Sequence, residues 1–305
     1  MQNKKPKCYV PHEYMNDSNY TKSSFYKNMF IEDIIHKVIP TSLKRNEDDF
    51  EVNLDCNEKD LDLINNILNS FNRTYREEYD ISKLVLNTIE EITRNIAWYG
   101  ESIFEICKVS DIDIKMVSLL PDKFINFKFF YIQIPPKNND KTLYPKIIPN
   151  KLLWKISVPQ ILQKNYSFKT ILANIDQFSS FMPKSMEKDF YAGNNISIYN
   201  HEKYDEKNFL YVNELTKDWG WDQRKWTSND KTTDFYNLYK QLKFKYSLSI
   251  FREHIIFELN NLFSKIKVDA TIKLENTVTS NEYKDNLEKF LSGQITYNEI
   301  IEFLY

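Results

Sequence analysis

The chain has 305 residues, of which 42% are apolar and 15% aromatic, enough for the core of one large or two modest domains. Its formal net charge of -2 gives the chain as a whole no excess charge that would attract nucleic acid or an anionic membrane. It contains only four glycines, which argues against a Gly-rich phosphate loop and so against nucleotide-hydrolysing motors and dinucleotide-binding enzymes.

The two signs of charge are unevenly distributed along the chain. Residues 123–169 contain nine lysines and one acid, whereas residues 47–113 contain seventeen acids and six bases. Such blocks predict either that neighbouring subunits meet through opposite charges or that one surface is kept for a polyanion. Two solvated faces of opposite sign explain the pattern equally well.

Cysteine and histidine usage bounds the chemistry further. The three cysteines lack CxxC spacing and the four histidines are scattered, which argues against a zinc site, a disulfide scaffold or a catalytic triad. We therefore expect no metal, no cofactor and synthesis in a reducing compartment. We also expect neither a signal peptide nor a membrane span, since no run of about 18 apolar residues occurs.

The first part of the chain predicts an N-terminal arm and then helices. Residues 1–29 form the polar arm, and helical spacing follows at about residues 29–39 and 59–71. The most strongly periodic helical pattern begins at Asp80 and needs a buried partner along its length. Gly100 follows this pattern and predicts a left-handed turn from a core helix into the strand "SIFEICKV".

The middle of the chain alternates extended and helical patterns. Residues 112–158 are strand-like with many prolines, and residues 167–191 are helical with an interruption at Pro183. Gly193 predicts a turn that feeds the strand "NNISIYN". Residues 216–230 predict a loop, and residues 232–263 a helix longer than most globular helices.

The C-terminal residues predict a helical hairpin. Thr279 with Glu282, and Thr296 with Glu299, have the spacing of capping boxes at the starts of two helices. Gly293 lies between them, where it can end the first helix.

Each of three other sequence patterns has both a functional and a structural explanation. Asp113 and Lys115 lie two apart, so on a strand they share a side, where the carboxylate can bind Mg²⁺ and the amine orient a water in a nuclease; an exposed charged strand is the more common reason for such spacing.

The lysine-rich span has aromatic residues between its lysines, as in "KFINFKFFYIQIPPK". It can serve a non-catalytic nucleic-acid or protein adaptor that uses Lys146, Lys151 and Lys155. A half-buried strand with Phe inward and Lys outward is favoured over this.

The third pattern is a group of tryptophans. Trp219, Trp221 and Trp226 can form an exposed contact patch, or they can be buried at a packed junction.

Several stretches, taken in order, resemble the portal proteins of tailed bacteriophages. The helix, Tyr-Gly turn and strand of that family are similar to residues 85–108, its Leu-x-Pro segment to "VSLLPDKF", and its next short strand to "KLLWKIS". "DFYAGNNISIYN" is similar to the junction of stem and clip, and the most specific match is "FLSGQITYNEIIEFL", which resembles the C-terminal Gly-x-Ile-Thr-x-Asn-Glu motif.

The resemblance implies a short or reduced portal protein, a non-enzymatic subunit of a dodecameric homo-oligomeric ring at one capsid vertex. Double-stranded DNA would pass through its channel during packaging and ejection. The implied partners are the terminase large subunit, the major capsid protein and a head-completion or adaptor protein, with no membrane. The implied location is the capsid portal vertex of the virion, and the host cytoplasm during assembly.

The resemblance also implies an α+β fold with an α/β wing, long stem helices and a small β-containing clip. After the arm, residues 30–160 would be the first part of the wing, 161–192 a stem helix and 193–231 the clip with a connecting loop. Residues 232–263 would be the long stem helix and 264–305 the C-terminal part of the wing.

The sequence departs from the family in two places. It ends directly after the helical hairpin, so we expect no crown, and the segment between clip and long helix is compressed. The candidate tunnel loop is residues 219–230, where Arg224, Lys225 and also Lys231 are the candidates to face DNA.

Overall fold

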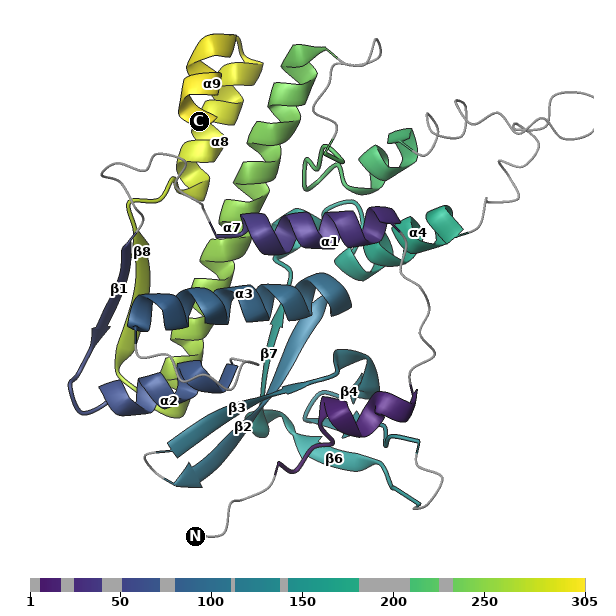
Figure 1. Ribbon diagram of the computed structural model, residues 1–305, viewed down its shortest axis with the longest axis vertical. Helices are drawn as coiled ribbons and strands as arrows, with labels where there is room; N and C mark the ends of the chain where they lie inside the picture. The colour runs from purple at the N-terminus through teal and green to yellow at the C-terminus, as the bar shows by residue number, and fades with distance from the viewer. Residues whose placement is uncertain are drawn as a thin grey trace, which may run out of the picture. The chain divides into compact units, whose positions relative to one another are not determined.

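The computed structural model describes residues 6–17, 25–39, 51–71, 80–110, 113–137, 142–180, 209–224 and 233–304. This part of the chain combines helices with small antiparallel sheets, so the expected α+β class is confirmed (Figure 1). Gly193, Trp226, Lys225 and Lys231 lie outside the described residues.

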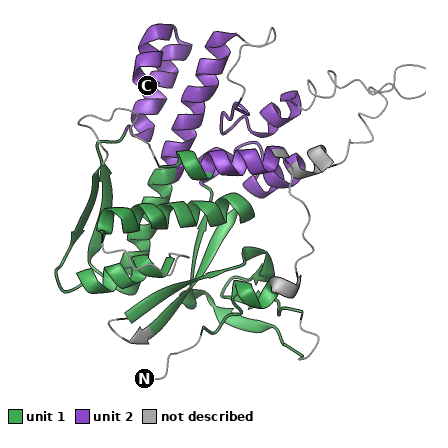
Figure 2. Cartoon of the chain, in the orientation of Figure 1, with its two compact units in different colours: residues 1–21, 35–158, 252–277 green, residues 22–34, 159–251, 278–305 purple. Residues whose placement is uncertain are grey.

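The chain divides into two compact units (Figure 2). Unit 1 consists of residues 1–21, 35–158 and 252–277, and unit 2 of residues 22–34, 159–251 and 278–305. The boundaries fall inside two helices, α1 (Phe25–Lys37) and α7 (Asp234–Ile266), so each of these helices contributes residues to both units.

Unit 1 contains three antiparallel sheets. Their strands, in sheet order, are β3 (Asp113–Leu119), β2 (Glu101–Ser110) and β7 (Leu153–Ser157); β4 (Phe124–Asn126), β5 (Phe130–Gln133) and β6 (Lys146–Pro149); and β1 (Glu51–Cys56) with β8 (Ala270–Glu275). The helices of unit 1 are α2 (Leu61–Phe71) and α3 (Ile81–Tyr99), with 3-10 turns at Pro11–Asp17, Pro121–Lys123 and Asn150–Leu152.

The core of unit 1 is built on the apolar face of α3. Every third or fourth residue from Leu84 to Ile96 is fully buried, as the helical period requires for a face that packs on neighbours. Nearby, the rings of Phe71, Phe104 and Trp154 lie with centroids 4.9 to 5.8 Å apart. Such aromatic contacts add to the burial of apolar area and fix α2 against the β3–β2–β7 sheet.

Gly100 joins α3 to β2 through a left-handed residue. Its φ is 78° and its N–H donates to the carbonyl of Ile96 at 2.7 Å. A residue with a Cβ is strained at this φ, so glycine lets the chain leave the helix and enter the strand at once.

Unit 2 is helical in its described residues. It contains the first part of α1, the 3-10 turn Gln160–Gln163, α4 (Phe168–Ser180), helical residues 209–215, the first part of α7, α8 (Ser280–Leu291) and α9 (Tyr297–Leu304). Trp219 and Trp221 are fully buried among the rings of Phe30, Phe168 and Phe251. For these two tryptophans, burial at a packed junction is therefore confirmed over an exposed patch.

The C-terminal hairpin packs on α7 within unit 2. Leu238 and Leu242 of α7 share an apolar cluster with Phe290, Ile300 and Leu304. The apolar faces of α8 and α9 thus gain the buried partner that short helices need for stability.

Both helices of the hairpin begin with a capping box. The Thr279 hydroxyl accepts from the Glu282 N–H at 3.3 Å while the Glu282 carboxylate accepts from the Thr279 N–H at 2.7 Å. Thr296 and Glu299 repeat the arrangement, with distances of 3.3 and 2.6 Å. Between the helices, Gly293 has a φ of 72°.

We expect Thr279→Ala to lower the free energy of unfolding of unit 2 by about 1 kcal/mol at neutral pH, because a cap is lost. Hydrogen bonds from Thr279 hold the pKa of Glu282 below its usual value. The ionised carboxylate therefore stabilises the fold at every pH above the ordinary pKa of a glutamate. This contribution is lost as the pH falls through the lowered pKa that Glu282 has in the folded chain. Urea unfolding at pH 7 and pH 3 should show a smaller difference between wild type and variant at pH 3. Thr277→Ala, two residues earlier, is the control and should change neither value.

Candidate functional site

The candidate tunnel loop begins as a buried turn of unit 2. Residues 216–220 form a turn after the helical residues 209–215, and Gly220 has a φ of 75° between the two buried tryptophans. Arg224 is the last described residue before residue 233, and α7 begins at Asp234. The described half of the predicted loop is therefore fixed by packing.

Arg224 is held by two carboxylates of α1. Its Nε donates to Asp33 at 2.9 Å and a terminal nitrogen donates to Glu32 at 3.2 Å. Asp33 is buried and also accepts from the indole N–H of Trp221 at 2.8 Å. The Arg224 side chain remains 38% exposed, so this network positions a guanidinium that still reaches solvent. Its role in facing DNA stays a prediction.

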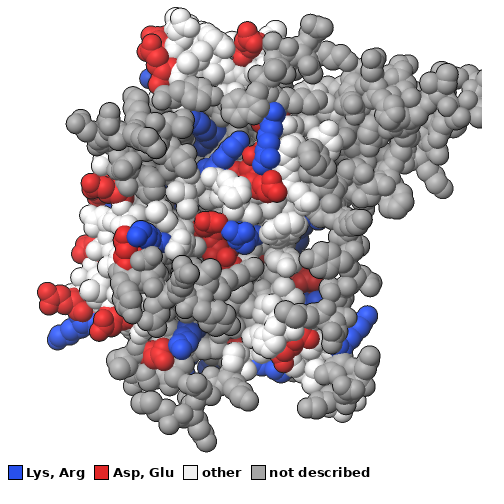
Figure 3. Space-filling model, viewed as in Figure 1, with Lys and Arg blue, Asp and Glu red and all other residues white. Residues whose placement is uncertain are grey.

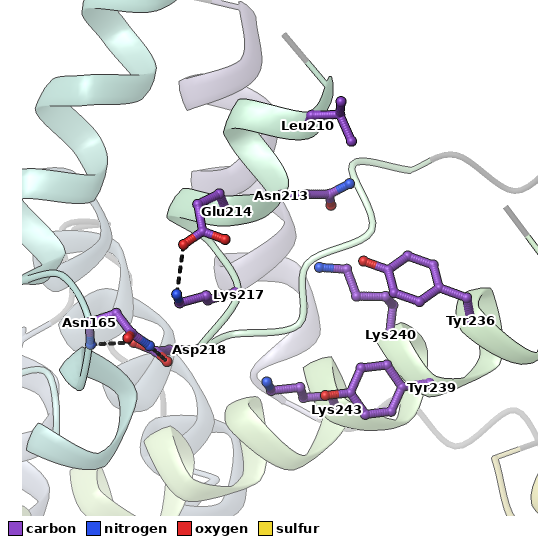
Figure 4. A pocket seen from close by; sticks show the side chains of 10 residues that line it. All are labelled: Asn165, Leu210, Asn213, Glu214, Lys217, Asp218, Tyr236, Tyr239, Lys240 and Lys243. Carbon is purple, nitrogen blue, oxygen red and sulfur yellow. Dashed lines mark hydrogen bonds and ion pairs between the residues drawn. The ribbon is translucent and has the colours of Figure 1, made fainter. Parts of the chain in front are cut away.

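A pocket of about 490 Å³ lies next to this turn in unit 2 (Figure 4). It is lined by residues before α4, by the segment 210–218 and by α7: Asn165, Leu210, Asn213, Glu214, Lys217, Asp218, Tyr236, Tyr239, Lys240 and Lys243. No sequence pattern pointed to this pocket, because its walls come from separate segments: Asn165 lies 45 positions before Leu210, and Tyr236 lies 18 positions after Asp218.

The two acids of the pocket have partners. The Lys217 ammonium lies 2.6 Å from the Glu214 carboxylate, and Asp218 accepts from the backbone and side-chain N–H groups of Asn165 at 2.8 and 2.5 Å. The dashed lines in Figure 4 mark these contacts on one side of the pocket.

The two α7 lysines that line the pocket, Lys240 and Lys243, have no acidic partner among the described residues. Lys240 is only 4% exposed and its Nζ lies 6.0 Å from the centroid of the Tyr236 ring, while the Nζ of Lys243 lies 5.7 Å from that of Tyr239. Within the described ranges, no carboxylate forms an ion pair with either ammonium. Burial, and secondarily the charge of Lys243, lower the pKa of Lys240 to about 8.

The pair proposed for a nuclease lies at one edge of unit 1. Asp113 is half-buried opposite Ser110, and Lys115 is exposed opposite Cys107. Among neighbouring acids, Glu101 pairs with Lys155, and both oxygens of Glu105 accept backbone N–H groups. The described residues contain no group of three or more His, Cys, Asp or Glu that could hold a metal ion.

The lysines proposed for an adaptor differ in their surroundings. The Nζ of Lys146 lies 3.6 Å from the centroid of the Tyr9 ring, Lys155 pairs with Glu101 at 2.5 Å, and Lys151 is exposed. Basic and acidic side chains lie beside one another on the part of Figure 3 that shows unit 1. Part of the basic block is therefore neutralised within its own unit.

The expected inward orientation of the phenylalanines in the lysine-rich span is wrong for two of them. Phe127 and Phe129 are 43% and 73% exposed, because β4 ends at Asn126 and both residues lie in the turn before β5. Ile125, Ile132 and Ile147 are register partners across β4, β5 and β6. We name the surface made of Ile125, Ile132 and Ile147 the outer sheet face.

A search of the described helices finds none that is both long enough and apolar enough to cross a membrane.

Comparisons with known proteins identify no family for this chain. No protein-family model matches the chain, and no curated protein does. One solved structure, described as the virion of a native gene transfer agent particle, aligns with 92% of this chain and 88% of that chain at 9% identity and a TM-score of 0.45.

Proposed function

We propose that this chain is the subunit of a portal-like ring at a capsid vertex. The ring would form the channel for DNA packaging and ejection and would dock the terminase and the tail or adaptor proteins. One observation carries the proposal: the stretches that resemble portal proteins occur in the order of that family. In support, the described ones fall on α3–Gly100–β2, on the end of β3 with the 3-10 turn Pro121–Lys123, on β7 with the turn before it, and on the capped hairpin α8–α9.

In this proposal the wing, stem and clip keep the bounds expected from the resemblance. The long stem helix corresponds to much of α7, and Lys225 and Lys231 would complete the DNA-facing group with Arg224. The subunit needs no catalytic residue of its own, because the packaging ATPase is a separate protein in that family.

A ring subunit needs a surface that contacts its neighbour, and the outer sheet face is our candidate. Ile147 is 68% exposed and Ile125 is 48% exposed, and they lie at the two ends of a cross-strand row whose middle residue is Ile132. An apolar row across three strands is unusual on a surface that meets only water, since contiguous exposed apolar patches commonly mark interaction sites. We assign a second copy of this chain as the occupant.

Charge favours this occupant. Lys128 and Lys151 lie in the turns before β5 and after β6 of the same sheet. Exposed acids lie on β1, in the turn after it and at the start of α2, namely Glu51, Asp55, Glu58 and Asp62. An apolar surface flanked by bases on one copy and an acidic surface on the next make a heterologous contact. Heterologous contacts form a closed ring when the rotation between neighbouring copies divides a full turn evenly.

We expect the purified chain to form closed rings, visible by mass photometry and negative-stain microscopy on the same sample. Ile147→Asp should convert most rings to monomers, because it places a charge in the centre of the proposed contact. Leu291→Asp on α8 is the matched control, because Leu291 is also an exposed aliphatic residue, and it should leave the rings intact.

The two parts of the proposal fail separately. A chain that stays monomeric across salt conditions, and that also fails to assemble with capsid or scaffold protein, contradicts the ring. Rings that persist in Ile147→Asp contradict only the outer sheet face as the contact. Mg²⁺-dependent DNA cleavage that disappears in Asp113→Ala would instead support the nuclease.

A further inference from the structure

The pocket of unit 2 contains two ammonium groups that nothing in the proposed ring function uses. Lys240 and Lys243 are three residues apart on α7 and therefore lie on the same side of that helix. In Figure 4 their side chains lie beside Tyr236 and Tyr239 on one wall of the pocket. The acids Glu214 and Asp218 line the pocket from the segment 210–218.

Two like charges in this position oppose folding unless something compensates them. A buried ammonium is costly without an ion pair, and a second ammonium one turn away adds repulsion. Lys240 is only 4% exposed, its Nζ lies near the Tyr236 ring, and within the described residues no carboxylate forms an ion pair with it. The attraction of Asp222 is outweighed by burial and by the charge of Lys243. An anion in the pocket would offset both costs.

The acids of the pocket do not supply that anion. Glu214 lies against Lys217, and Asp218 is occupied by two N–H groups of Asn165. Lys217 offsets the charge of Glu214, whereas the neutral Asn165 only hydrogen-bonds to Asp218. Neither acid forms an ion pair with Lys240 or Lys243, so the α7 wall stays electropositive.

The polar groups at the pocket match a phosphate group. The two ammoniums and the hydroxyls of Tyr236 and Tyr239 are donors, which suits the several acceptor oxygens of a phosphoryl group. The side-chain oxygen of Asn213 is buried without a hydrogen-bond partner, and a protonated phosphate oxygen can donate to it. A carboxylate offers only two oxygens and, when ionised, no donor.

We propose that this pocket binds the phosphate group of a small phosphomonoester, with Lys240 and Lys243 as its cationic ligands. The volume of about 490 Å³ lies within the range of about 300 to 1,000 Å³ that is typical of small-molecule sites, so there is room for more than the phosphate. The rings of Tyr236 and Tyr239 offer apolar surface to the remainder of the ligand.

The test is isothermal titration of the full chain at pH 7 with inorganic phosphate and with adenosine monophosphate. We expect saturable binding of both, with the nucleotide bound more tightly. Lys240→Met and Lys243→Met should each weaken binding at least tenfold. Lys284→Met, an exposed lysine of α8 whose ammonium lies 3.8 Å from Glu288, is the control and should bind as wild type does.

The affinity should also depend on pH through Lys240. Its pKa of about 8 in the free protein means that the ammonium is present below this pH and is lost above it, so binding should weaken as the pH rises from 7 to 9.5. Sulfate, which has no proton to donate, should bind more weakly than phosphate. The other charged or titratable groups that line the pocket or contribute to the pKa of Lys240 are Lys217, Glu214, Asp218, Asp222, Lys243, Tyr236 and Tyr239.

Several outcomes overturn the proposal. It fails if neither probe binds at millimolar concentration, or if Lys284→Met weakens binding as much as the two pocket variants do. It also fails if a short DNA duplex binds but neither inorganic phosphate nor adenosine monophosphate binds or competes with the duplex. The pocket would then recognise nucleic acid and not a small phosphomonoester. Circular dichroism checks that each variant is folded, and if Lys240→Met is not, Lys243→Met decides alone.

Discussion

Gly220→Ala is expected to lower the free energy of unfolding of unit 2 by about 3 kcal/mol. The backbone conformation at this position disfavours any residue with a Cβ, and the new methyl group would also collide with α7. Gly220 has a φ of 75°, where residues with a Cβ are strained. A Cβ there would lie 2.7 Å from Cβ and Cγ of Lys243 and 2.9 Å from the backbone nitrogen of Phe244. The nitrogen belongs to α7 and cannot move aside as a flexible side chain can.

The displacement would reach the core at once, because Trp219 and Trp221 on either side of the glycine are fully buried. We expect urea unfolding followed by tryptophan fluorescence to show the loss as a lower midpoint. We also expect a changed emission of the native protein, since the aromatic cluster must shift.

Gly293→Ala is the matched control for Gly220→Ala. Gly293 has a φ of 72°, nearly that of Gly220, but a Cβ there would have no neighbour within 4 Å. It should therefore cost only the strain of the positive φ, about 1 kcal/mol. Equal losses in the two variants would show that backbone strain, and not the contact with α7, determines the effect.

These glycines show what local sequence can predict. Gly100 and Gly293 follow helical patterns, and the spacing of Thr279 with Glu282 predicts a cap, because each feature is decided by residues a few positions apart. The tight approach of Gly220 to α7 involves residues 23 positions later, which no local pattern reports.

The sheets divide in the same way. β2 is visible as an apolar run after a glycine, whereas β1 pairs with β8, whose residues lie more than 200 positions away. Glu51 to Cys56 does alternate polar and apolar residues, which is a strand signal, but without its partner such a short run is ambiguous. The outer sheet face was missed for a related reason: periodicity alone does not tell which side of a strand is covered.

The candidate site was predictable only in part. A loop with buried tryptophans was one of two expected outcomes, but the contact of Arg224 with α1 joins residues about 190 positions apart. The buried Lys240 had no signal either, because a lysine within an amphipathic helix is ordinarily on its solvated side.

Asp33→Asn is expected to lower the free energy of unfolding of unit 2 by about 3 kcal/mol, because two buried or half-buried donors converge on this carboxylate. Its oxygens accept from the indole of Trp221 at 2.8 Å and from Arg224 at 2.9 Å, and its side chain is only 3% exposed. The amide of asparagine can accept with its one oxygen, but its NH₂ group would face the other donor. The guanidinium would also lose its buried counter-charge.

Glu32→Gln tests whether burial is the cause. Glu32 contacts the same arginine at 3.2 Å, but its side chain is 54% exposed, so water screens the pair and the loss should be at most about 1 kcal/mol. Urea unfolding of both variants at the same salt concentration gives the comparison, and added salt should reduce only the smaller effect. If the two variants lose the same stability, Arg224 is held by surface charge alone, and the turn that carries it is not fixed by Asp33. If Asp33→Asn loses far more, the orientation of Arg224 depends on the buried core of unit 2, and any contact it makes with DNA begins from a preorganised guanidinium.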